Sequence, residues 1–417
     1  MQAFLQGCEW RCALNINEKN KRFDGNIIDI TEEYVRSKII KRPQDSHKGT
    51  FGKVLCIAGS FRYRGAAALA VEGALRGGCG IVTLASVEPV FASIQPRLPE
   101  AILLSCKPDE VGGIGASNAA MLIEEAIKDQ RAVLMGPGMG NTESTSILVK
   151  EIVSSVFASY KGNSGASNSG AGGSSAGSSG ASNSGAGGSS AGSSGASNSG
   201  AGESCTVVLD ADALNAIPAA GLTIGEIIGM KAASAQSSDA GENTGKAASA
   251  QSAGAGNDTG KVGSAQDAGA GNSAADSCGS RLIITPHPGE MARLCGCTIA
   301  DIKADREKII TDFARENNCV VVLKEHRTLI ALPDGRIYRN TTGNSGLARG
   351  GSGDILAGMT ASFAASGMSA EDAAVCAVWM HGKSAELTSE RKSQTAMLPH
   401  DIFEDMGKLF LSFEKQV

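Results

Sequence analysis

The stretch N-T-T-G-N-S-G-L-A-R-G-G-S-G-D, residues 340–354, runs directly into the helix-like sequence I-L-A-G-M-T-A-S-F. Its glycines let the backbone turn several N–H groups toward one point, and the helix adds the positive end of its dipole. Loop and helix together favour an anion, most simply a phosphoryl group in transfer. Asp354 closes the loop with a carboxylate placed to take a proton from an attacking hydroxyl. A glycine-rich turn with an N-capping aspartate is the plain alternative, because a bare G-x-G-D is a weak motif.

Two blocks of the 417-residue chain differ in composition from the rest. Residues 161–203 repeat G-A-S-N-S-G-A-G-G-S-S-A-G-S-S, and residues 231–280 repeat K-A-A-S-A-Q-S and its relatives. Neither block has the apolar residues that could offset the entropy of ordering a chain. We therefore predict two disordered low-complexity insertions with no binding role. The remaining sequence, roughly 320 residues, has the size of one large α/β domain.

Charge and hydropathy exclude several functions. The formal net charge is -5, which argues against a nucleic-acid surface. No apolar run approaches the ~20 residues of a membrane span. The N-terminal sequence M-Q-A-F-L-Q-G-C-E-W-R-C lacks the basic start and apolar core of a secretory signal. We expect a cytoplasmic protein with no nucleic-acid partner and no membrane partner.

The rest of the chain alternates short apolar runs with helical patterns. Buried strands are predicted at residues 54–58, 81–85, 132–135, 206–209, 282–285 and 319–323. Helices are predicted from Ala66 and over residues 369–387, where His381 is expected to be structural. Continuous apolar runs of this length are typical of parallel strands that are buried on both faces. The alternation predicts an α/β fold, a three-layer α/β/α domain with a mainly parallel sheet.

Unusual sequences follow five of these strands. They are Gly-Ser after residue 58, Gly-Pro-Gly after 135, Asp-x-Asp after 209, Pro-His-Pro-Gly-Glu after 285, and a lysine after 323. Ligands of open parallel sheets bind beyond the carboxyl ends of the strands. Five such sequences in succession therefore predict a single site at that edge.

At this point the motifs resemble a known family. K-G-T-F-G-K-V-L-C-I-A-G-S, G-P-G-M-G, L-D-A-D-A-L-N, T-P-H-P-G-E and T-G-N-S-G-L-A-R-G-G-S-G-D occur in the order of the NAD(P)H-hydrate dehydratase family. The resemblance implies a ribokinase-like fold in one domain, residues 31–415, after an N-terminal extension of residues 1–30. It also implies a stand-alone dehydratase that cooperates with a separate epimerase.

The resemblance implies repair of hydrated NADH and NADPH. Members act on the S epimer of the hydrate, phosphorylate its ring hydroxyl with ADP or ATP, and eliminate phosphate to restore the nicotinamide. Phosphate leaves more readily than hydroxide, so a kinase fold suits a dehydratase. The resemblance further implies Mg²⁺ as the ion that screens the phosphates, ADP more than ATP as the donor, and a homotetramer.

Roles for individual residues follow from the same resemblance. Asp354 contacts the substrate, and we assign it the general-base role on the ring hydroxyl. The backbone amides of the phosphate loop hold the transferring group. The loop consists of Gly350, Gly351, Ser352 and Gly353. The substrate contacts are Ala66, Gly138, His287 and Asp354. The nucleotide contacts are Lys324, Glu325, His326, Arg327, Thr328 and Gly353.

Each assignment has a structural alternative. His287 could be an exposed loop residue, Gly138 a tight turn, and Ala66 an ordinary helix start. Glu290 could hold Mg²⁺ through water, or it could begin a helix as an N-terminal carboxylate. In the Asp-x-Asp sequence, the two carboxylates could orient Asn215 or a water near the phosphates, or serve a strand-to-helix turn.

The segment after residue 323 departs from the family pattern. Lys324 and Thr328 are in place, but Glu325 stands where the family has a glycine. Glutamate reaches positive φ only with strain, and its charge would face a polyanionic nucleotide. His326 and Arg327 could compensate as hydrogen-bond donors.

Two other functions fit parts of the sequence. One is a ribokinase-like kinase of a small alcohol or vitamin precursor, since such kinases share the G-x-G-D sequence. The other is a weakly catalytic nucleotide-binding protein, which Glu325 and the repeats suggest. The Pro-His-Pro-Gly-Glu and L-D-A-D-A-L-N sequences favour the dehydratase over both.

Overall fold

A computed structural model describes residues 25–161, 205–230 and 280–415. The insertions expected at 161–203 and 231–280 therefore lie almost entirely outside the described residues, as do residues 1–24 of the expected extension. The chain divides into two units, Met1–Lys231 with Ser280–Val417, and Ala232–Gly279. Everything below concerns the described part of the first unit.

The described residues contain one ten-stranded sheet in the order β1-β10-β9-β8-β7-β6-β5-β2-β3-β4. Strand β9 is antiparallel to both of its neighbours, and the other pairs are parallel. The predicted mainly parallel sheet is confirmed. The strands are β1 (Ile27–Asp29), β2 (Lys53–Ile57), β3 (Ile81–Val87), β4 (Ile102–Cys106), β5 (Ala132–Met135), β6 (Thr206–Leu209), β7 (Leu282–Ile284), β8 (Val320–Leu323), β9 (Leu329–Ala331) and β10 (Ile337–Arg339).

Four strands were not predicted from the sequence: β1, β4, β9 and β10. Three of them have only three residues each, too few to show a periodicity, and β4 is partly exposed at the edge of the sheet. Strand β1 pairs with β10 in the register Ile27↔Ile337, so the sheet begins inside the segment expected to precede the domain. These strands exist because a distant segment supplies their hydrogen bonds.

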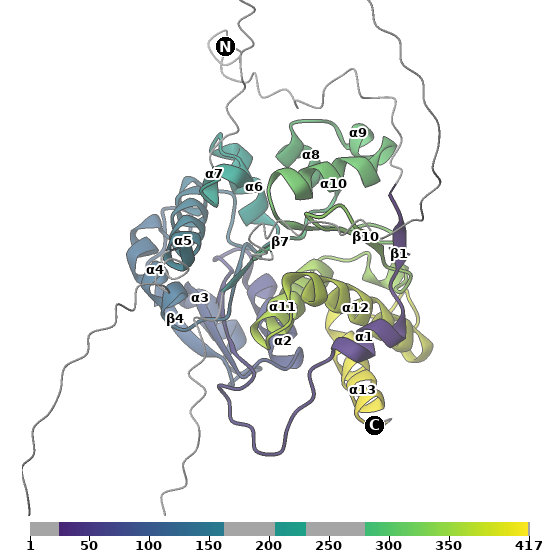
Figure 1. The fold of residues 1–417 in the computed structure, drawn as a ribbon. Helices are drawn as coiled ribbons and strands as arrows, with labels where there is room; N and C mark the ends of the chain where they lie inside the picture. The colour runs from purple at the N-terminus through teal and green to yellow at the C-terminus, as the bar shows by residue number, and fades with distance from the viewer. Residues whose placement is uncertain (1–24, 162–204, 231–279, 416–417) are drawn as a thin grey trace, which may run out of the picture. The chain divides into compact units, whose positions relative to one another are not determined.

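Helices cover both faces of the sheet (Figure 1). The set α4, α5, α6, α7, α8, α9 and α10 packs on one face, and the set α1, α2, α3, α11, α12 and α13 packs on the other. This is the predicted three-layer arrangement. The helices are α1 (Glu32–Lys38), α2 (Arg64–Arg76), α3 (Glu88–Ile94), α4 (Ala119–Lys128), α5 (Glu143–Lys161), α6 (Asp212–Ala219), α7 (Ile224–Ile227), α8 (Pro288–Cys295), α9 (Ile299–Ala304), α10 (Arg306–Glu316), α11 (Ser352–Ala365), α12 (Ala370–Lys392) and α13 (Ile402–Glu414).

Helix α11 follows the glycine-rich loop and is buried between α2 and the sheet. Glycines let its backbone approach α2 closely. A Cβ at Gly358 would lie 2.1 Å from the carbonyl oxygen of Ala70, and a Cβ at Gly73 would lie 2.6 Å from that of Ile355. This close packing fixes where the first turn of α11 lies relative to the strand ends.

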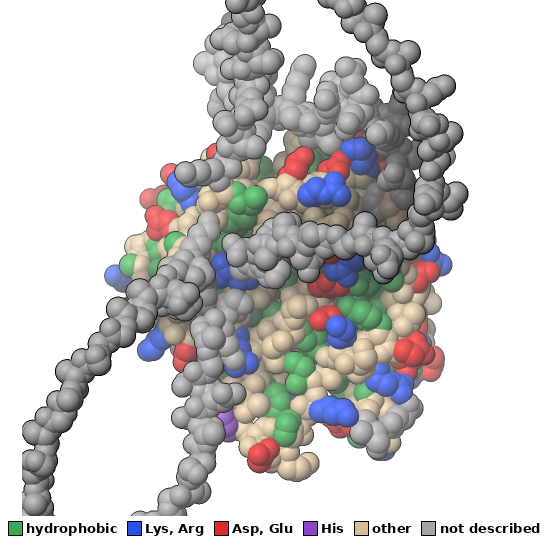
Figure 2. All heavy atoms as spheres, in the orientation of Figure 1, with side chains coloured by type: hydrophobic (Ala, Val, Ile, Leu, Met, Phe, Trp, Pro, Cys, Tyr) green, Lys and Arg blue, Asp and Glu red, His purple; other side chains and the backbone are tan. Residues whose placement is uncertain are grey.

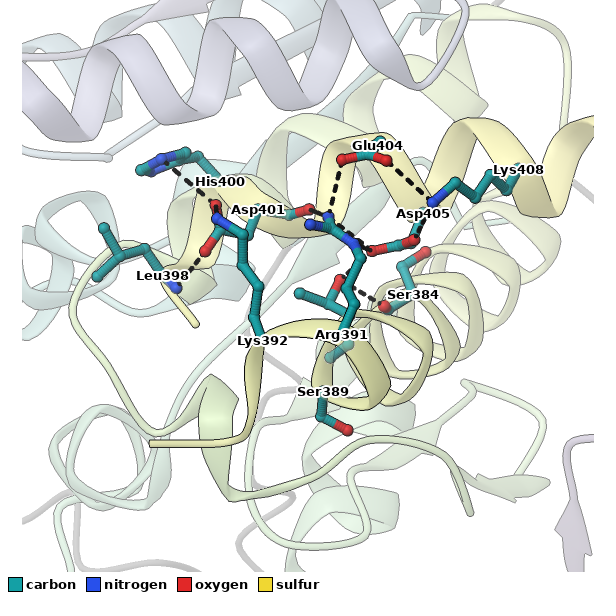
Figure 3. A network of polar contacts seen from close by, with 12 residues as sticks. Ser384, Ser389, Arg391, Lys392, Leu398, His400, Asp401, Glu404, Asp405 and Lys408 are labelled. Atoms are coloured by element: carbon teal, nitrogen blue, oxygen red, sulfur yellow. Dashed lines mark hydrogen bonds and ion pairs between the residues drawn. The ribbon is translucent and has the colours of Figure 1, made fainter. Parts of the chain in front are cut away.

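A polar network joins α12 to α13 (Figure 3). Asp405 is 2% exposed and accepts hydrogen bonds from Thr388 Oγ1 at 2.7 Å and Arg391 Nε at 2.9 Å. Lys408 Nζ lies 3.0 Å from the other carboxylate oxygen of Asp405. Hydrogen bonds to charged groups are stronger than neutral ones, so the network holds the last helix in place.

The surface shown in Figure 2 carries positive and negative side chains interspersed among hydrophobic and uncharged ones. This mixture agrees with the small formal net charge of -5. Among the described helices, none is long and apolar enough to cross a membrane.

Candidate active site

The predicted site residues come from loops at the carboxyl ends of β2, β5, β6, β7 and β8, and from the start of α11. Two contacts show that these segments meet. The backbone N–H of Lys324, after β8, donates to the Pro286 carbonyl after β7 at 2.8 Å. A Cβ at Gly353, in α11, would lie 3.2 Å from Lys324 Nζ and 3.8 Å from Asp210 Oδ2. These contacts bring the segments after β6, β7 and β8 together with the start of α11.

A buried ion pair lies at the centre of the cluster. Lys324 Nζ is 2.5 Å from Asp210 Oδ1, and Thr285 Oγ1 donates to the same oxygen at 2.7 Å. Burial alone would lower the pKa of Lys324, but the carboxylates of Asp210, Glu290 and Asp354 outweigh it, and the pKa is raised. Lys324 therefore keeps its positive charge at neutral pH, beside the phosphate loop.

Asp354 is the third residue of α11. Burial, together with the charges of Asp210 and Asp212, raises its pKa to about 6, and Lys324 opposes this rise. A carboxylate with a pKa near neutrality is a better proton acceptor than an ordinary one, yet it is still ionised at pH 7. Its position and pKa suit the general-base role.

The phosphate loop has the backbone geometry that an anion site requires. Gly351, the N-cap of α11, has φ of 101°, and a Cβ there would lie 2.5 Å from Leu69 Cδ1, so only glycine fits. Within the described residues, the Ser352 N–H donates to the Arg349 carbonyl, and no backbone hydrogen bond occupies the amides of Gly350, Gly351 and Gly353. Amides in the first turn of a helix have no partner inside it, which leaves them available to a ligand.

His287 and Glu290 form the capping box of α8. His287 Nδ1 accepts from the N–H groups of Gly289 at 2.9 Å and Glu290 at 3.3 Å, and Glu290 Oε2 accepts from the His287 N–H at 2.8 Å. Burial, with Lys324 and Arg293, lowers the pKa of His287, so the ring is neutral. Since Nδ1 is an acceptor, Nε2 carries the proton. The side chain of His287 is 51% exposed.

The same box places Glu290 in the first turn of α8, where its carboxylate is 6% exposed and lies 3.3 Å from His287 Nε2. Burial raises its pKa to about 7, partly opposed by Lys324. The N-terminal carboxylate role anticipated as one alternative is therefore present in the structure. A role in holding Mg²⁺ through water stays a prediction. No group of three or more His, Cys, Asp or Glu side chains that could hold a metal occurs in the described residues.

Ala66 and Gly138 lie against each other although they are far apart in sequence. Gly138 has φ of 64°, and a Cβ there would lie 2.8 Å from Ala66 Cβ and 2.7 Å from Tyr63 Cβ. Ser60 Oγ donates to the Gly138 carbonyl at 2.8 Å and ties the two loops together. Gly138 is thus both a tight turn and a place where a side chain would intrude. The two predicted substrate contacts share one location.

Residues 324–328 form the turn between β8 and β9. The positive φ of this turn, 58°, falls on Arg327 and not on Glu325, so glutamate is not strained at its position. Glu325 Oε2 lies 3.4 Å from Arg306 Nη1, which offsets its charge. Thr328 Oγ1 donates to the Glu325 carbonyl at 3.2 Å. His326 and Arg327 are exposed, as a role in binding a nucleotide requires.

The sequence did not indicate the contacts that two residues, Arg306 and His381, make near the site. Arg306 begins α10 and reaches Glu325, and nothing local in the sequence indicates that pairing. His381 lies buried behind the loop, where burial lowers its pKa to about 4 against the opposing effect of the Ser352 backbone. A neutral His381 beneath Ser352 supports the loop from α12, consistent with the structural role expected for it.

The layers, the strand order and a glycine-rich loop at the start of a buried helix define a ribokinase-like protein. A ribokinase-like superfamily protein from Enterococcus faecalis has the same fold, with a TM-score of 0.61, 18% identity, and coverage of 95% of this chain and 99% of the other. A family model described as NAD(P)H-hydrate dehydratase matches residues 54–161 and 264–408, more than half of the chain. The chain belongs to the NAD(P)H-hydrate dehydratase family.

Two relatives are similar to this chain over most of its length. The crystal structure of the ADP/ATP-dependent NAD(P)H-hydrate dehydratase from Bacillus subtilis, co-crystallised with ATP/Mg²⁺, is similar with a TM-score of 0.59 and 26% identity. That match covers 93% of this chain and 99% of the other. The bifunctional NAD(P)H-hydrate repair enzyme of Moorella thermoacetica is 28% identical over 93% of this chain. The chain spans 54% of that enzyme's length, about half.

Proposed function

We propose that this protein dehydrates the S epimer of NADH hydrate and NADPH hydrate, using ADP or ATP as phosphoryl donor. The observation that carries the proposal is the position of Asp354 in the first turn of α11. There it stands beside three free loop amides and near the Lys324 ammonium, with its pKa raised to about 6. A base, an anion site and a fixed cation are the parts that phosphorylation of a hydroxyl needs.

The chemistry follows from these groups. Asp354 accepts the proton of the ring hydroxyl while that oxygen attacks the terminal phosphorus of the nucleotide. The loop amides and Lys324 stabilise the charge on the transferring oxygens, because they are already oriented and need no rearrangement. The carbon that carries the phosphate ester then loses phosphate as the ring nitrogen supplies its electron pair. The resulting iminium ion loses a proton from the neighbouring ring carbon to solvent, which restores the ring double bond. NADH or NADPH is regenerated and AMP or ADP is released.

Mg²⁺ fits this site in the way it usually binds nucleotides. Magnesium is commonly held by one or two carboxylates together with phosphate oxygens and waters, and not by an all-protein cage. The described residues offer no such cage, but they offer the buried carboxylate of Glu290 close to Lys324. Glu290 would hold the ion through water, and the ion would screen the nucleotide phosphates.

The proposal also covers the phosphoryl donor, the cellular location, the oligomeric state and a partner enzyme. We expect ADP to be the better donor and the protein to act in the cytoplasm as a homotetramer. A separate epimerase would supply the S epimer from the R epimer. The relative from Moorella thermoacetica, which carries the name of a bifunctional repair enzyme, supports such cooperation.

The proposal is tested by turnover of chemically prepared NADH hydrate with Mg²⁺ and ADP, ATP or no nucleotide. The expected result is nucleotide-dependent recovery of the reduced-nicotinamide absorbance. We expect Asp354→Asn to slow that recovery by about 10²–10⁴-fold, the usual contribution of a general base. The variant should still bind ADP, because the loop amides are unchanged. A folded protein that recovers no NADH with either nucleotide would contradict the proposal and favour a small-alcohol kinase.

A further inference from the structure

A cavity of ≈ 570 Å³ lies at the carboxyl ends of β3 and β4, beyond the residues described above. Val87 and Cys106, the last residues of these two strands, line it together with Phe61 and Lys107. Its volume is within the range of small-molecule sites. Phe61 belongs to the loop that runs from β2 to Ala66, so the cavity adjoins the predicted hydrate contacts.

The strand order sets the direction in which a long substrate would extend. Along this edge of the sheet, Lys324 follows β8, Asp210 follows β6 and Gly138 follows β5. Ala66 lies in the helix that follows β2, and the cavity lies beyond β3 and β4. Figure 1 shows β4 and β1 at opposite ends of the sheet. With neighbouring strands ~4.8 Å apart, the edge from β8 to β4 spans about 29 Å. Asp354 lies near Asp210 at the β6 end, four strand spacings or about 19 Å from β4. A dinucleotide with its hydrated ring at Asp354 would therefore extend toward the cavity and leave the β8 end to ADP.

The segment between the hydrate contacts and the cavity has the sequence F-R-Y-R, residues 61–64. Phe61 is 59% exposed and Tyr63 is 46% exposed. The guanidinium of Arg64 lies 4.7 Å from the centre of the Phe61 ring, and that of Arg62 lies 5.7 Å from the Tyr63 ring. Exposed rings flanked by guanidinium groups are suited to a planar base that carries phosphates.

Three basic side chains belong to the cavity or to the segment beside it: Lys107 lines the cavity, and Arg62 and Arg64 lie in residues 61–64. Arg62, Arg64 and Lys107 form no ion pair with any carboxylate of the described residues. The Arg64 Nε donates to the Phe61 carbonyl at 3.1 Å, which leaves its terminal nitrogens available and fixes the direction of the side chain. Three carboxylates, those of Glu88, Asp109 and Glu110, also line the cavity, and carboxylates are the usual acceptors for ribose hydroxyls.

We propose that residues 61–64 and this cavity bind the adenosine-diphosphate half of the dinucleotide substrate. The guanidinium groups of Arg62 and Arg64 take the diphosphate, and the space beside Phe61 takes the adenosine. The identity of the ligand rests on the proposed function. The consequence is selectivity: the protein favours a hydrated dinucleotide over the hydrate of reduced nicotinamide mononucleotide, which lacks that half.

The first test measures binding without catalysis. ADP-ribose is titrated into the full chain in the presence of saturating ADP, which fills the co-substrate site. We expect binding that weakens at least tenfold in the double variant Arg62→Gln/Arg64→Gln and that is unchanged in Arg76→Gln, at the other end of α2. Thermal unfolding of each variant confirms that it is folded. Either no binding beyond ADP, or equal binding by all three proteins, would overturn the proposal.

The second test separates the subsite from the reaction. With NADH hydrate, the double variant is expected to raise KM at least tenfold, and with the mononucleotide hydrate its kinetics should match those of the wild type. A wild type that uses both hydrates equally well would overturn the subsite. If neither hydrate is turned over but ADP-ribose binding is lost in the double variant, the proposed function fails while the anion- and base-binding subsite stands.

Discussion

At the residue scale, the environment of Asp354 decides what this site can do. An aspartate on an exposed helix end would have an ordinary pKa and would be a weak base. Here burial and the nearby carboxylates of Asp210 and Asp212 raise the pKa to about 6, while Lys324 limits the rise. The sequence locates the aspartate in its loop, but these neighbours come from other strand ends. Its pKa is therefore a property of the folded chain.

This pKa predicts the pH dependence of the reaction. The base must be ionised, so kcat/KM should fall about tenfold per unit of pH below 6 and level off above about 7. The profile is measured with NADH hydrate and saturating ADP between pH 5 and 8, corrected for spontaneous loss of the hydrate. A midpoint near 4, the value of an unperturbed aspartate, would show that burial does not control this carboxylate.

The Lys324–Asp210 pair gives a second prediction at this scale. In Lys324→Met, Asp210 stays buried without its cation, and breaking such a pair costs about 3–5 kcal/mol of unfolding free energy. The pKa of Asp354 should also rise, because Lys324 normally lowers it.

Urea unfolding at pH 7 measures this effect. Lys383→Met is a matched control, because Lys383 pairs with Glu386 at 3.0 Å on a partly exposed face of α12. Exposed pairs contribute about 0–1 kcal/mol. Equal destabilisation by the two substitutions would show that the Lys324–Asp210 pair does not stabilise the fold more than a surface pair.

At the element scale, the packing of α11 on α2 positions the phosphate loop. Gly358 and Gly73 allow the two backbones to meet, since any larger residue would overlap a carbonyl of the other helix. The same glycines look unfavourable in a helix when only the local sequence is considered. Their role becomes clear only from the partner helix.

We predict that Gly358→Ala destabilises the protein by about 1–3 kcal/mol, the cost of overpacking a buried contact, although alanine is the better helix former. Gly65→Ala, in the first turn of α2, is the control, because a Cβ there meets nothing within 4 Å. Chemical unfolding at one pH compares the two variants. If Gly358→Ala proves as stable as the wild type, the two helices can separate without loss and the contact does not fix the loop.

At the scale of the whole molecule, the sequence divides into α/β sequence and two repeat blocks. The repeat blocks enter between α5 and β6 and between α7 and β7. Both connections join elements at the sheet's amino-terminal edge, because each block precedes a parallel strand. The site residues follow the strands at the opposite edge.

Shortening both insertions should therefore leave the protein folded and active. Replacing residues 165–200 and 235–275 with short glycine-serine linkers is expected to raise the unfolding free energy by only about 2–3 kcal/mol in total, since each halving of a loop saves about 0.6 kcal/mol of closure entropy. Calorimetry and NADH hydrate turnover check this expectation. A large loss of activity with an unchanged melting temperature would assign the repeats a functional role.

The sequence by itself determined the alternation of buried strands and helices, the strand ends that carry the site, and the phosphate loop. It could do so because parallel strands need continuous apolar runs, and because such sheets bind ligands at one edge. The tertiary structure alone decided that β1 pairs with β10, that Arg306 offsets Glu325, and that the pKa of Asp354 is raised. These features depend on partners distant in sequence, whose approach no local pattern records.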